Sequence, residues 1–342
     1  MSFFSESRFF KTLILSGVML ASLPGLQNPA RAEVSEVTIA KQYGLLFLPL
    51  VIMEQNKLVE KQAAAAGMPN LAVKWQRMTG GNVMNEALIA GGLDFASGGV
   101  PAFLILWSKT HGNMDVKGVA AMASLPMYLN TRDPKVKTIK DFSDSNRIAL
   151  PAVGVSIQAI SLQMAVAKIW GQDQARRLDK YTVTLAHPEA MAAMLSNMGN
   201  VDSHFASPPY NFMELKKPGI HKVLDSYDVL GPATGTVVWT TSKFQRENPK
   251  VYKIFLAAFQ EAIDLINNDK KQAAELYIKS TNNKESFEDT LEIISDPHTE
   301  YTATPKGIIE YTRFLRNVGL INKAPASWKD LFFPEVHSLS GS

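Results

Sequence analysis

The feature that most limits the fold of this chain is a succession of strand-like and helix-like segments that occurs twice. The first succession covers residues 36–97 and the second covers residues 148–205. Each ends in a similar segment, LDFASGGVP at 93–101 and VDSHFASPP at 201–209, which starts with an apolar residue and Asp and has Pro at the same offset. Strands that alternate with helices pair in parallel within an α/β sheet. The sequence therefore predicts two similar α/β lobes.

The individual elements follow from hydrophobic periodicity, because alternation predicts strands and steps of three and four predict helices. From Asn248 onward, apolar residues such as Phe255 and Phe259 recur at helical spacing, which favours a buried helix face over a ligand-binding aromatic stripe. We expect this helical section to pack on the first lobe, so that the chain crosses between the lobes more than once. The predicted strands are residues 36–40, 71–75, 93–97, 148–150, 181–185 and 201–205, and the predicted helices are residues 83–90, 156–170, 189–198, 272–278 and 305–318, together with the long helix from residue 248.

The N-terminus has the pattern of an export signal. Arg8 and Lys11 precede an apolar run at 13–23, and Ala30-Arg31-Ala32 has the small residues that signal peptidase requires. The run is shorter than the ~18 residues that cross a bilayer, which argues against a membrane anchor. We expect cleavage after Ala32 and export to a bacterial periplasm. The mature chain is expected to comprise the first part of lobe 1 (33–125), lobe 2 (126–230) and the completion of lobe 1 with the C-terminal helices (231–342).

Composition argues against several classes of function. The formal net charge is +3, and the expected signal holds three basic residues and one acidic residue, so the mature chain carries 3 − 2 = +1. Such a balance gives no electrostatic footprint for nucleic acid. The absence of cysteine excludes a disulfide framework and a lipid-bearing thiol. The six histidines form no H-x-x-x-H pair and there is no P-loop, so we expect neither a metal nor another cofactor.

The segment Gly154-Val155-Ser156-Ile157-Gln158 allows two interpretations. It is one residue short of the G-x-S-x-G nucleophile elbow, so an exported serine hydrolase that uses Ser156 is one hypothesis. Gln158, however, stands where the elbow needs a small residue. The alternative is that Ser156 caps a helix whose free backbone N–H groups hold an anion. The segment Thr79-Gly80-Gly81-Asn82 offers the same arrangement in the other lobe, with Thr79 or Asn82 as the cap. We favour the cap and predict that Ser156 donates a hydrogen bond to a ligand.

The order of several short segments gives a family resemblance. They are EVTIAKQYGLLFLPLVIMEQNKLVEK at 36–61, LDFASGGVP at 93–101, KTIKDF at 137–142, VDSHFASPPY at 201–210, and SKF and ENP within 242–249. In this order and spacing the chain resembles the solute-binding proteins of bacterial ABC transporters, in particular the nitrate, sulfonate and taurine group with its thiamin-pyrimidine-like members. The thiamin-pyrimidine-forming enzymes of this fold carry a Cys-rich segment, which this chain lacks.

The resemblance implies a two-lobed periplasmic-binding-protein fold of type II, an α/β fold with lobes joined by crossover strands. It also implies a protein without enzymatic activity that captures a small organic solute between the lobes and delivers it to an ABC permease and its ATPase; a sensor is the alternative partner. We expect a monomer, because capture and delivery need a cleft that opens and closes freely. By position, the candidate ligand-binding residues are Gln42, Tyr43, Arg77, Thr79, Gly80, Gly81, Asn82, Gly98, Gly99, Val100, Ser124, Leu125, Gly154, Val155, Ser156, Gln158, His187, Ser207 and Pro208.

Two turns depart from the pattern of the sulfonate binders. Residues 154–158 replace a Gly-Ser-rich turn followed by His, and Ser207-Pro208-Pro209 replaces a Trp-Glu-Pro turn. An anion such as a sulfonate or a carboxylate would therefore depend on helix N-termini and hydroxyls, with Arg77 as a counter-charge. A neutral or aromatic solute that stacks on Tyr43 is the alternative.

Overall fold

The computed structural model describes residues 32–196, 198–281 and 285–342. The chain separates into two units, Met1–Ala32 and Glu33–Ser342, and the second unit contains all the elements described below. The predicted export signal lies outside the described residues, apart from its last residue, Ala32.

The N-terminal elements form a parallel strand pair next to a four-stranded sheet. β1 and β2 pair in parallel, with Glu36 opposite Ala72, and a bridge between Ile39 and Phe95 joins β1 to the residue before β3. The four-stranded sheet has the order β11-β4-β10-β3, in which β10 is antiparallel to both neighbours. The strands are β1 (Glu36–Lys41), β2 (Ala72–Arg77), β3 (Ala96–Gly99), β4 (Val116–Ser124), β10 (Thr236–Thr241) and β11 (Glu300–Tyr301), and the helices are α1 (Leu48–Gln55), α2 (Leu58–Ala65), α3 (Gly81–Ile89) and α4 (Val100–Thr110).

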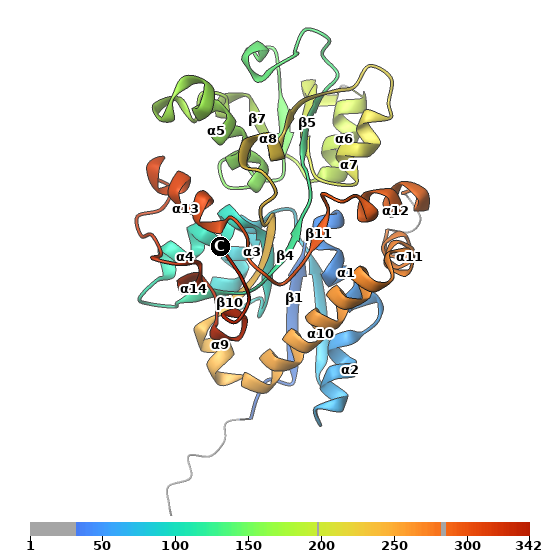
Figure 1. The fold of residues 1–342 in the computed structure, drawn as a ribbon, viewed down its shortest axis with the longest axis vertical. Coiled ribbons are helices and arrows are strands. Elements are labelled where there is room, and N and C mark those ends of the chain that lie inside the picture. The colour runs from blue at the N-terminus through green and yellow to red at the C-terminus, as the bar shows by residue number, and fades with distance from the viewer. Residues whose placement is uncertain (1–31, 197, 282–284) are drawn as a thin grey trace, which may run out of the picture. The chain divides into compact units, whose positions relative to one another are not determined.

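A five-stranded sheet contains strands from residues 128–225, with the order β7-β6-β8-β5-β9. β6 pairs in parallel with β7 and β8, as the alternation of strands and helices predicts, whereas β5 is antiparallel to β8 and β9. Figure 1 shows α5, α6 and α7 beside this sheet. Its strands are β5 (Tyr128–Thr131), β6 (Ile148–Leu150), β7 (Thr182–Thr184), β8 (Ser203–Ala206) and β9 (His221–Asp225), and its helices are α5 (Ile157–Trp170), α6 (His187–Ser196), α7 (Tyr210–Leu215) and α8 (Ser226–Leu230).

The chain passes between the two sheets twice among the described residues, once from β4 to β5 and once from β9 through α8 to β10. The predicted crossing is therefore confirmed. The remaining helices follow β10 and are α9 (Ser242–Glu247), α10 (Pro249–Asn268), α11 (Lys270–Ser280), α12 (Phe287–Ser295), α13 (Ile308–Asn317) and α14 (Trp328–Leu331).

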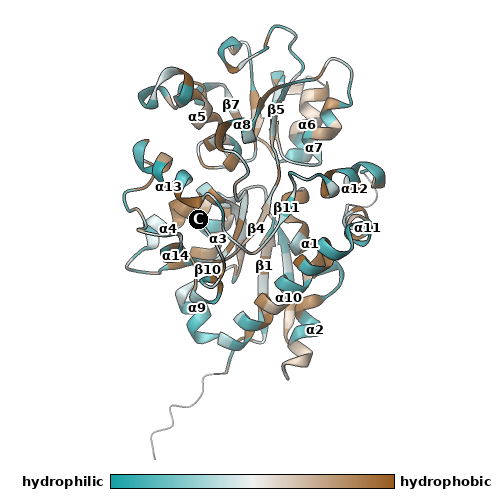
Figure 2. Ribbon diagram, in the orientation of Figure 1, coloured by the Kyte–Doolittle hydropathy of each residue, from teal (hydrophilic) through white to brown (hydrophobic). Residues whose placement is uncertain are grey.

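The long helix α10 packs on the N-terminal elements, in particular on α1 and α2. Most of its apolar residues are buried, and the ring of Phe255 stacks on that of Phe95 with 3.9 Å between centroids. Figure 2 shows α10 alternating between hydrophobic and hydrophilic residues along its length. The expectation that the aromatic residues of this helix serve core packing is therefore confirmed.

Candidate functional site

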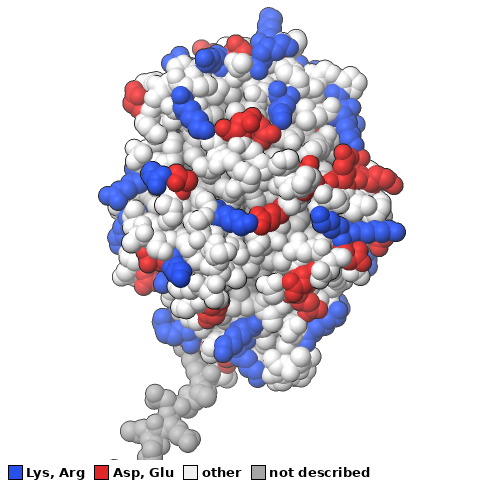
Figure 3. Space-filling model, viewed as in Figure 1, with Lys and Arg blue, Asp and Glu red and all other residues white. Residues whose placement is uncertain are grey.

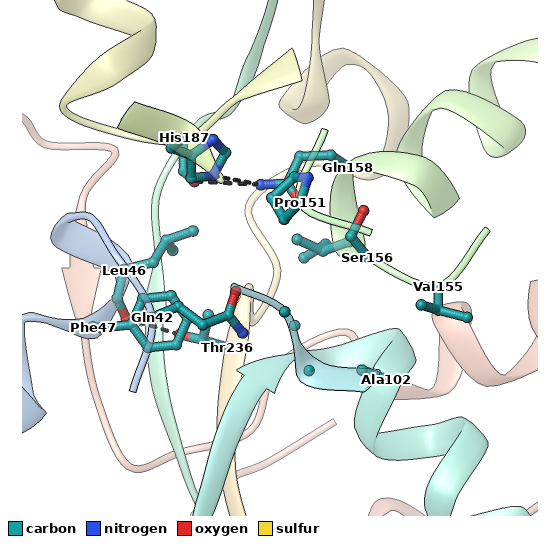
Figure 4. A pocket seen from close by; sticks show the side chains of 15 residues that line it. Gln42, Leu46, Phe47, Ala102, Pro151, Val155, Ser156, Gln158, His187 and Thr236 are labelled. Carbon is teal, nitrogen blue, oxygen red and sulfur yellow. Dashed lines mark hydrogen bonds between the residues drawn. The ribbon is translucent and has the colours of Figure 1, made fainter. Parts of the chain in front are cut away.

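A small pocket lies where elements of the two sheets meet, and we call it the polar pocket. Its volume is about 20 Å³, room for about one water-sized sphere. Figure 4 shows Gln42 and Thr236 on one side of it and Ser156, Gln158 and His187 on the other. Nine of the predicted site residues line it: Gln42, Gly80, Gly81, Gly99, Val155, Ser156, Gln158, His187 and Ser207. The other lining residues were not among the predicted site residues; they are Leu46, Phe47, Ala102, Pro151, Ile157 and Thr236.

The helix α5 begins at the polar pocket with the predicted cap. Ser156 has the extended backbone of an N-cap residue, and its Oγ accepts a hydrogen bond from the N–H of Ala159 at 3.2 Å. The N–H groups of Ile157 and Gln158, in the first helical turn, have no intrahelical acceptor. They lie at the positive end of the helix dipole, so this end of α5 can stabilise an anion without a charged side chain.

The helix α3 also begins at the polar pocket, but the predicted cap there is wrong. Gly80 is the N-cap residue and no side chain caps the helix, whereas Thr79 and Asn82 are both exposed. A Cβ at Gly80 would lie 2.8 Å from Asn82 Oδ1 and 3.3 Å from the carbonyl oxygen of Pro151. A side chain at this cap would therefore meet both the Asn82 side chain and the segment before α5.

Backbone segments from the two sides of the pocket are in close contact. A Cβ at Gly99 would lie 2.9 Å from Ile157 Cβ, and the N–H of Leu45 donates to the carbonyl oxygen of Pro208 at 2.8 Å. Gly44 has φ of +99°, a conformation that favours glycine, and its Cα faces the same carbonyl oxygen of Pro208. Glycines therefore permit the narrow spacing that keeps the polar pocket small.

Four buried side chains form a continuous hydrogen-bonded chain at one end of the pocket, and we call it the buried chain. Ser207 Oγ lies 2.6 Å from His187 Nε2, and His187 Nδ1 lies 2.8 Å from His204 Nε2. His204 Nδ1 in turn lies 2.5 Å from Glu214 Oε1. Burial lowers the pKa of His187 well below its ordinary value, and the nearby His204 lowers this pKa further. The His187 ring is therefore neutral. His204 and Glu214 were not predicted as site residues.

The contacts of Ser156 and His187 do not assemble a serine nucleophile. Ser156 Oγ accepts the N–H of Ala159, while His187 is hydrogen-bonded to Ser207, His204 and Gln158. An activated serine needs a general base within hydrogen-bond reach of its oxygen. His187 is therefore hydrogen-bonded to the Ser207 hydroxyl, and the Ser156 hydroxyl caps α5.

A larger apolar pocket adjoins the polar one and contains two predicted site residues, Tyr43 and Arg77. The guanidinium of Arg77 lies over the ring of Tyr43, 5.1 Å from the centroid. The volume of this apolar pocket is about 520 Å³, and its other lining residues are Pro188, Met191, Ala192, Leu195, Tyr210, Met213, Ser280, Thr281 and Glu285. The predicted counter-charge Arg77 thus belongs to the apolar pocket and not to the polar one.

The remaining predicted site residues lie outside both pockets. Ser124 Oγ is hydrogen-bonded to the Tyr227 hydroxyl at 2.7 Å, and Leu125 is buried in the core. Asn82 lines a separate pocket on α3 and α4, into which Val155 also reaches. The others are Thr79, Gly98, Val100, Gly154 and Pro208. Thr79 is exposed, Gly98 pairs with Val237 in the sheet, and Gly154 has φ of +73°. The N–H of Val100 donates to the carbonyl oxygen of Gly235, and the carbonyl oxygen of Pro208 accepts the N–H of Leu45.

The described residues show neither a metal site nor a membrane span. No group of three or more His, Cys, Asp or Glu side chains among them is placed to hold a metal ion. In the same part of the chain, no helix has the length and apolar character needed to cross a bilayer. Basic and acidic side chains are interspersed over the face seen in Figure 3.

Comparison with known proteins gives a family and a fold. Residues 30–279 match the NMT1-like family. The alkanesulfonate-binding protein SsuA from Xanthomonas axonopodis pv. citri is 16% identical, with a TM-score of 0.67 over 85% of this chain and 96% of that chain. The periplasmic aliphatic sulphonate binding protein SsuA from Escherichia coli is 20% identical, with a TM-score of 0.62 over 88% of this chain and 92% of that chain.

The periplasmic nitrate-binding protein NrtA from Synechocystis PCC 6803 is 15% identical, with a TM-score of 0.64 over 87% of this chain and 84% of that chain. No curated protein sequence matches the chain. These three structures are those of binding proteins, and they confirm the predicted α/β class. The chain belongs to the NMT1-like family and has the fold of the periplasmic substrate-binding proteins of ABC transporters.

Proposed function

We propose that this chain is the extracytoplasmic solute-binding component of an ABC importer and binds a small organic anion, such as a sulfonate or a carboxylate. In this proposal the chain is exported to the periplasm with cleavage after Ala32, and acts as a monomer that delivers its solute to a permease and an ATPase. Residues 33–125 and 231–342 form one lobe and residues 126–230 form the other. The solute is captured between them, with its charged group at the polar pocket.

The observation that carries the proposal is that two helix N-termini, those of α3 and α5, meet at a pocket without formal charges. No residue that lines the polar pocket in the described part of the chain is Lys, Arg, Asp or Glu. Free N–H groups at the two helix starts, with the amide of Gln158 and the hydroxyl of Ser207, supply neutral donors to an oxyanion. A cation would find no carboxylate there, so an anion fits the pocket best.

The two pockets together indicate the shape of the solute. Gln42 and His187 line the polar pocket, whereas the residues that follow them, Tyr43 and Pro188, line the apolar pocket. We place the charged group of the solute at the polar pocket and its organic body along the apolar pocket, against Tyr43 and Tyr210. We therefore expect an organic oxyanion to bind more tightly than nitrate.

A panel of solutes tests the proposed function. We expect one class among small sulfonates, carboxylates, nitrate, bicarbonate and pyrimidines to raise the melting temperature of protein that has been refolded to remove any carried solute. A solute at about a hundred times its dissociation constant adds about 2.7 kcal/mol to the free energy of unfolding. For a chain of this size that corresponds to a rise of about 4 °C. A response only to pyrimidines would contradict the anion, and no response at all would contradict the proposed function.

Ser156→Ala separates the two roles proposed for this hydroxyl. Loss of the cap should lower the free energy of unfolding by about 1 kcal/mol and leave a folded protein. Loss of the ligand contact should also weaken solute binding, because the hydroxyl lines the polar pocket. Calorimetric titration with the solute found in the panel measures this second effect.

Ser286→Ala is the matched control for Ser156→Ala. Ser286 caps α12 in the same way, with Oγ accepting the N–H of Asp289 at 3.2 Å, but it does not line the polar pocket. The control should lose a similar amount of stability and keep the wild-type affinity. If both variants bind the solute equally well, Ser156 is a cap and not a ligand-binding residue.

A further inference from the structure

The buried chain of Ser207, His187, His204 and Glu214 extends beyond the residues that can contact an anion in the polar pocket. Only Ser207 and His187 reach the polar pocket, whereas the side chains of His204 and Glu214 are 0% exposed. A buried carboxylate and a buried imidazole are unfavourable unless each has a partner, so their continuous connection to a pocket residue needs an explanation. The direction of the hydrogen bonds along the chain supplies one.

The buried chain can be hydrogen-bonded in two directions. In the inward arrangement His204 is neutral, and Ser207 O–H, His187 Nδ1–H and His204 Nδ1–H each donate towards the Glu214 carboxylate. In the outward arrangement one additional proton makes His204 a cation beside that carboxylate. His204 Nε2–H then donates to His187 Nδ1, and His187 Nε2–H donates to Ser207 Oγ. Only the outward arrangement leaves the Ser207 hydrogen free to donate into the polar pocket.

We propose that Glu214, His204 and His187 are positioning residues that set the Ser207 hydroxyl as a donor or an acceptor, so that the site binds an oxyanion together with one proton. The proposal rests on the proposed function, because it assumes that the solute is an anion. The incoming proton comes from solvent and resides on His204, while His187 exchanges its Nδ1–H for an Nε2–H. An oxyanion facing Ser207 meets a hydrogen in the outward arrangement and an oxygen lone pair in the inward one.

The groups around the buried chain favour His204 as the place of the additional proton. On α7, Glu214 is paired with His204, and the Tyr210 ring stacks on His187 at 5.5 Å between centroids. Burial raises the pKa of Tyr210, so this neighbour is neutral, and burial lowers the pKa of His187, so that ring stays neutral as well.

The other elements packed on the buried chain contribute uncharged groups. On β5, Asn130 Nδ2 donates to Glu214 Oε2 at 2.9 Å, and on α5, Gln158 Nε2 lies 3.3 Å from Ser207 Oγ. β6 and β8 carry no Asp, Glu, Lys or Arg, and the one such residue on α6, Glu189, is exposed. The Glu214 carboxylate is thus the charge that stabilises a proton on His204.

The tautomer of His187 tests the switch without any ligand. Protein labelled with ¹⁵N-histidine is examined by two-bond N–H correlation NMR at about pH 5.5 and about pH 8.5. We expect neutral His187 at both values, with the proton on Nε2 at the lower pH and on Nδ1 at the higher pH. His204 should change from a cation to a neutral ring. A His187 ring that keeps one tautomer throughout, or that becomes a cation, would overturn the proposal.

Glu214→Gln tests the origin of the switch, with Glu189→Gln as the matched control. A neutral amide at residue 214 cannot stabilise a cationic His204, so His187 should carry its proton on Nδ1 at both pH values. The control removes an exposed carboxylate from α6, the helix that carries His187, and should switch as the wild type does. Wild-type switching in the Glu214→Gln variant would contradict the role of the carboxylate.

Sodium ethanesulfonate is the probe for the coupling to an anion. As the pH is raised, the affinity for the probe should fall by up to about tenfold per pH unit, because one proton is bound with the anion. The affinity of Glu214→Gln should be low and independent of pH. A wild-type affinity that does not depend on pH would refute the coupling. If the tautomers switch but ethanesulfonate, nitrate and acetate all fail to bind, the anion proposal fails and the proton switch stands.

Discussion

Glu214→Leu should lower the free energy of unfolding by about 1–3 kcal/mol, because it leaves the buried Nδ1–H of His204 without its acceptor. His204 Nδ1 lies 2.5 Å from Glu214 Oε1, and both side chains are 0% exposed. Neither group can therefore form a hydrogen bond with solvent water when the other is removed. The amide of Asn130 would lose its acceptor Oε2 as well. Urea unfolding followed by circular dichroism measures the change in the free energy of unfolding.

Two further variants show whether the interaction itself is responsible. The double variant His204→Leu/Glu214→Leu removes both buried groups and should be less destabilised than the sum of the two single variants. Glu189→Leu removes an exposed glutamate near the same sheet and should change stability by no more than about 0.5 kcal/mol. If Glu214→Leu lowers the free energy of unfolding no more than Glu189→Leu does, the Glu214 carboxylate does not stabilise His204.

The elements with a clear period could be predicted from the sequence. Residues 36–40 alternate between apolar and polar side chains and lie in β1. The apolar residues that recur at steps of three and four after Asn248 belong to α10. The helix α4 and the strand β4 were not predicted. Nearly every residue of both is buried, so their sequences are apolar on all sides and have no period that separates helix from strand.

The candidate site could be predicted where it depends on the starts of helices. Ser156 and Gln158 follow from the position of α5, and both line the polar pocket. Gln42 and Tyr43 were predicted together, but Tyr43 lies in a bend after β1, and the two residues line different pockets. His204 lies in a predicted strand and Glu214 in a helix ten residues later, and only the fold places them in contact.

Gly99→Val should reduce solute affinity on the order of a hundredfold, because it prevents the two sides of the polar pocket from approaching each other. A Cβ at this position would lie 2.9 Å from Ile157 Cβ and 3.2 Å from the backbone N of Ile157. Overpacking of this kind costs about 3 kcal/mol at the high end of its usual range, and a backbone atom cannot move aside as a side-chain end can. If the lobes close on the solute as proposed, this cost opposes closure. Calorimetric titration with the solute found in the panel measures the loss.

The stability of the variant distinguishes blocked closure from damage to the fold. Gly99 has φ of −62° and ψ of 144°, an extended conformation that valine adopts readily, so the free protein should remain folded with its cleft open. Gly92→Val is the matched control, since the atom nearest to a Cβ there is the Ala87 carbonyl oxygen at an ordinary 3.5 Å. Small-angle scattering should show that Gly99→Val stays expanded when solute is added, while Gly92→Val contracts as the wild type does. Wild-type affinity in Gly99→Val would mean that the contact between Gly99 and Ile157 is not part of the solute-bound state, and that the solute binds in a wider cleft.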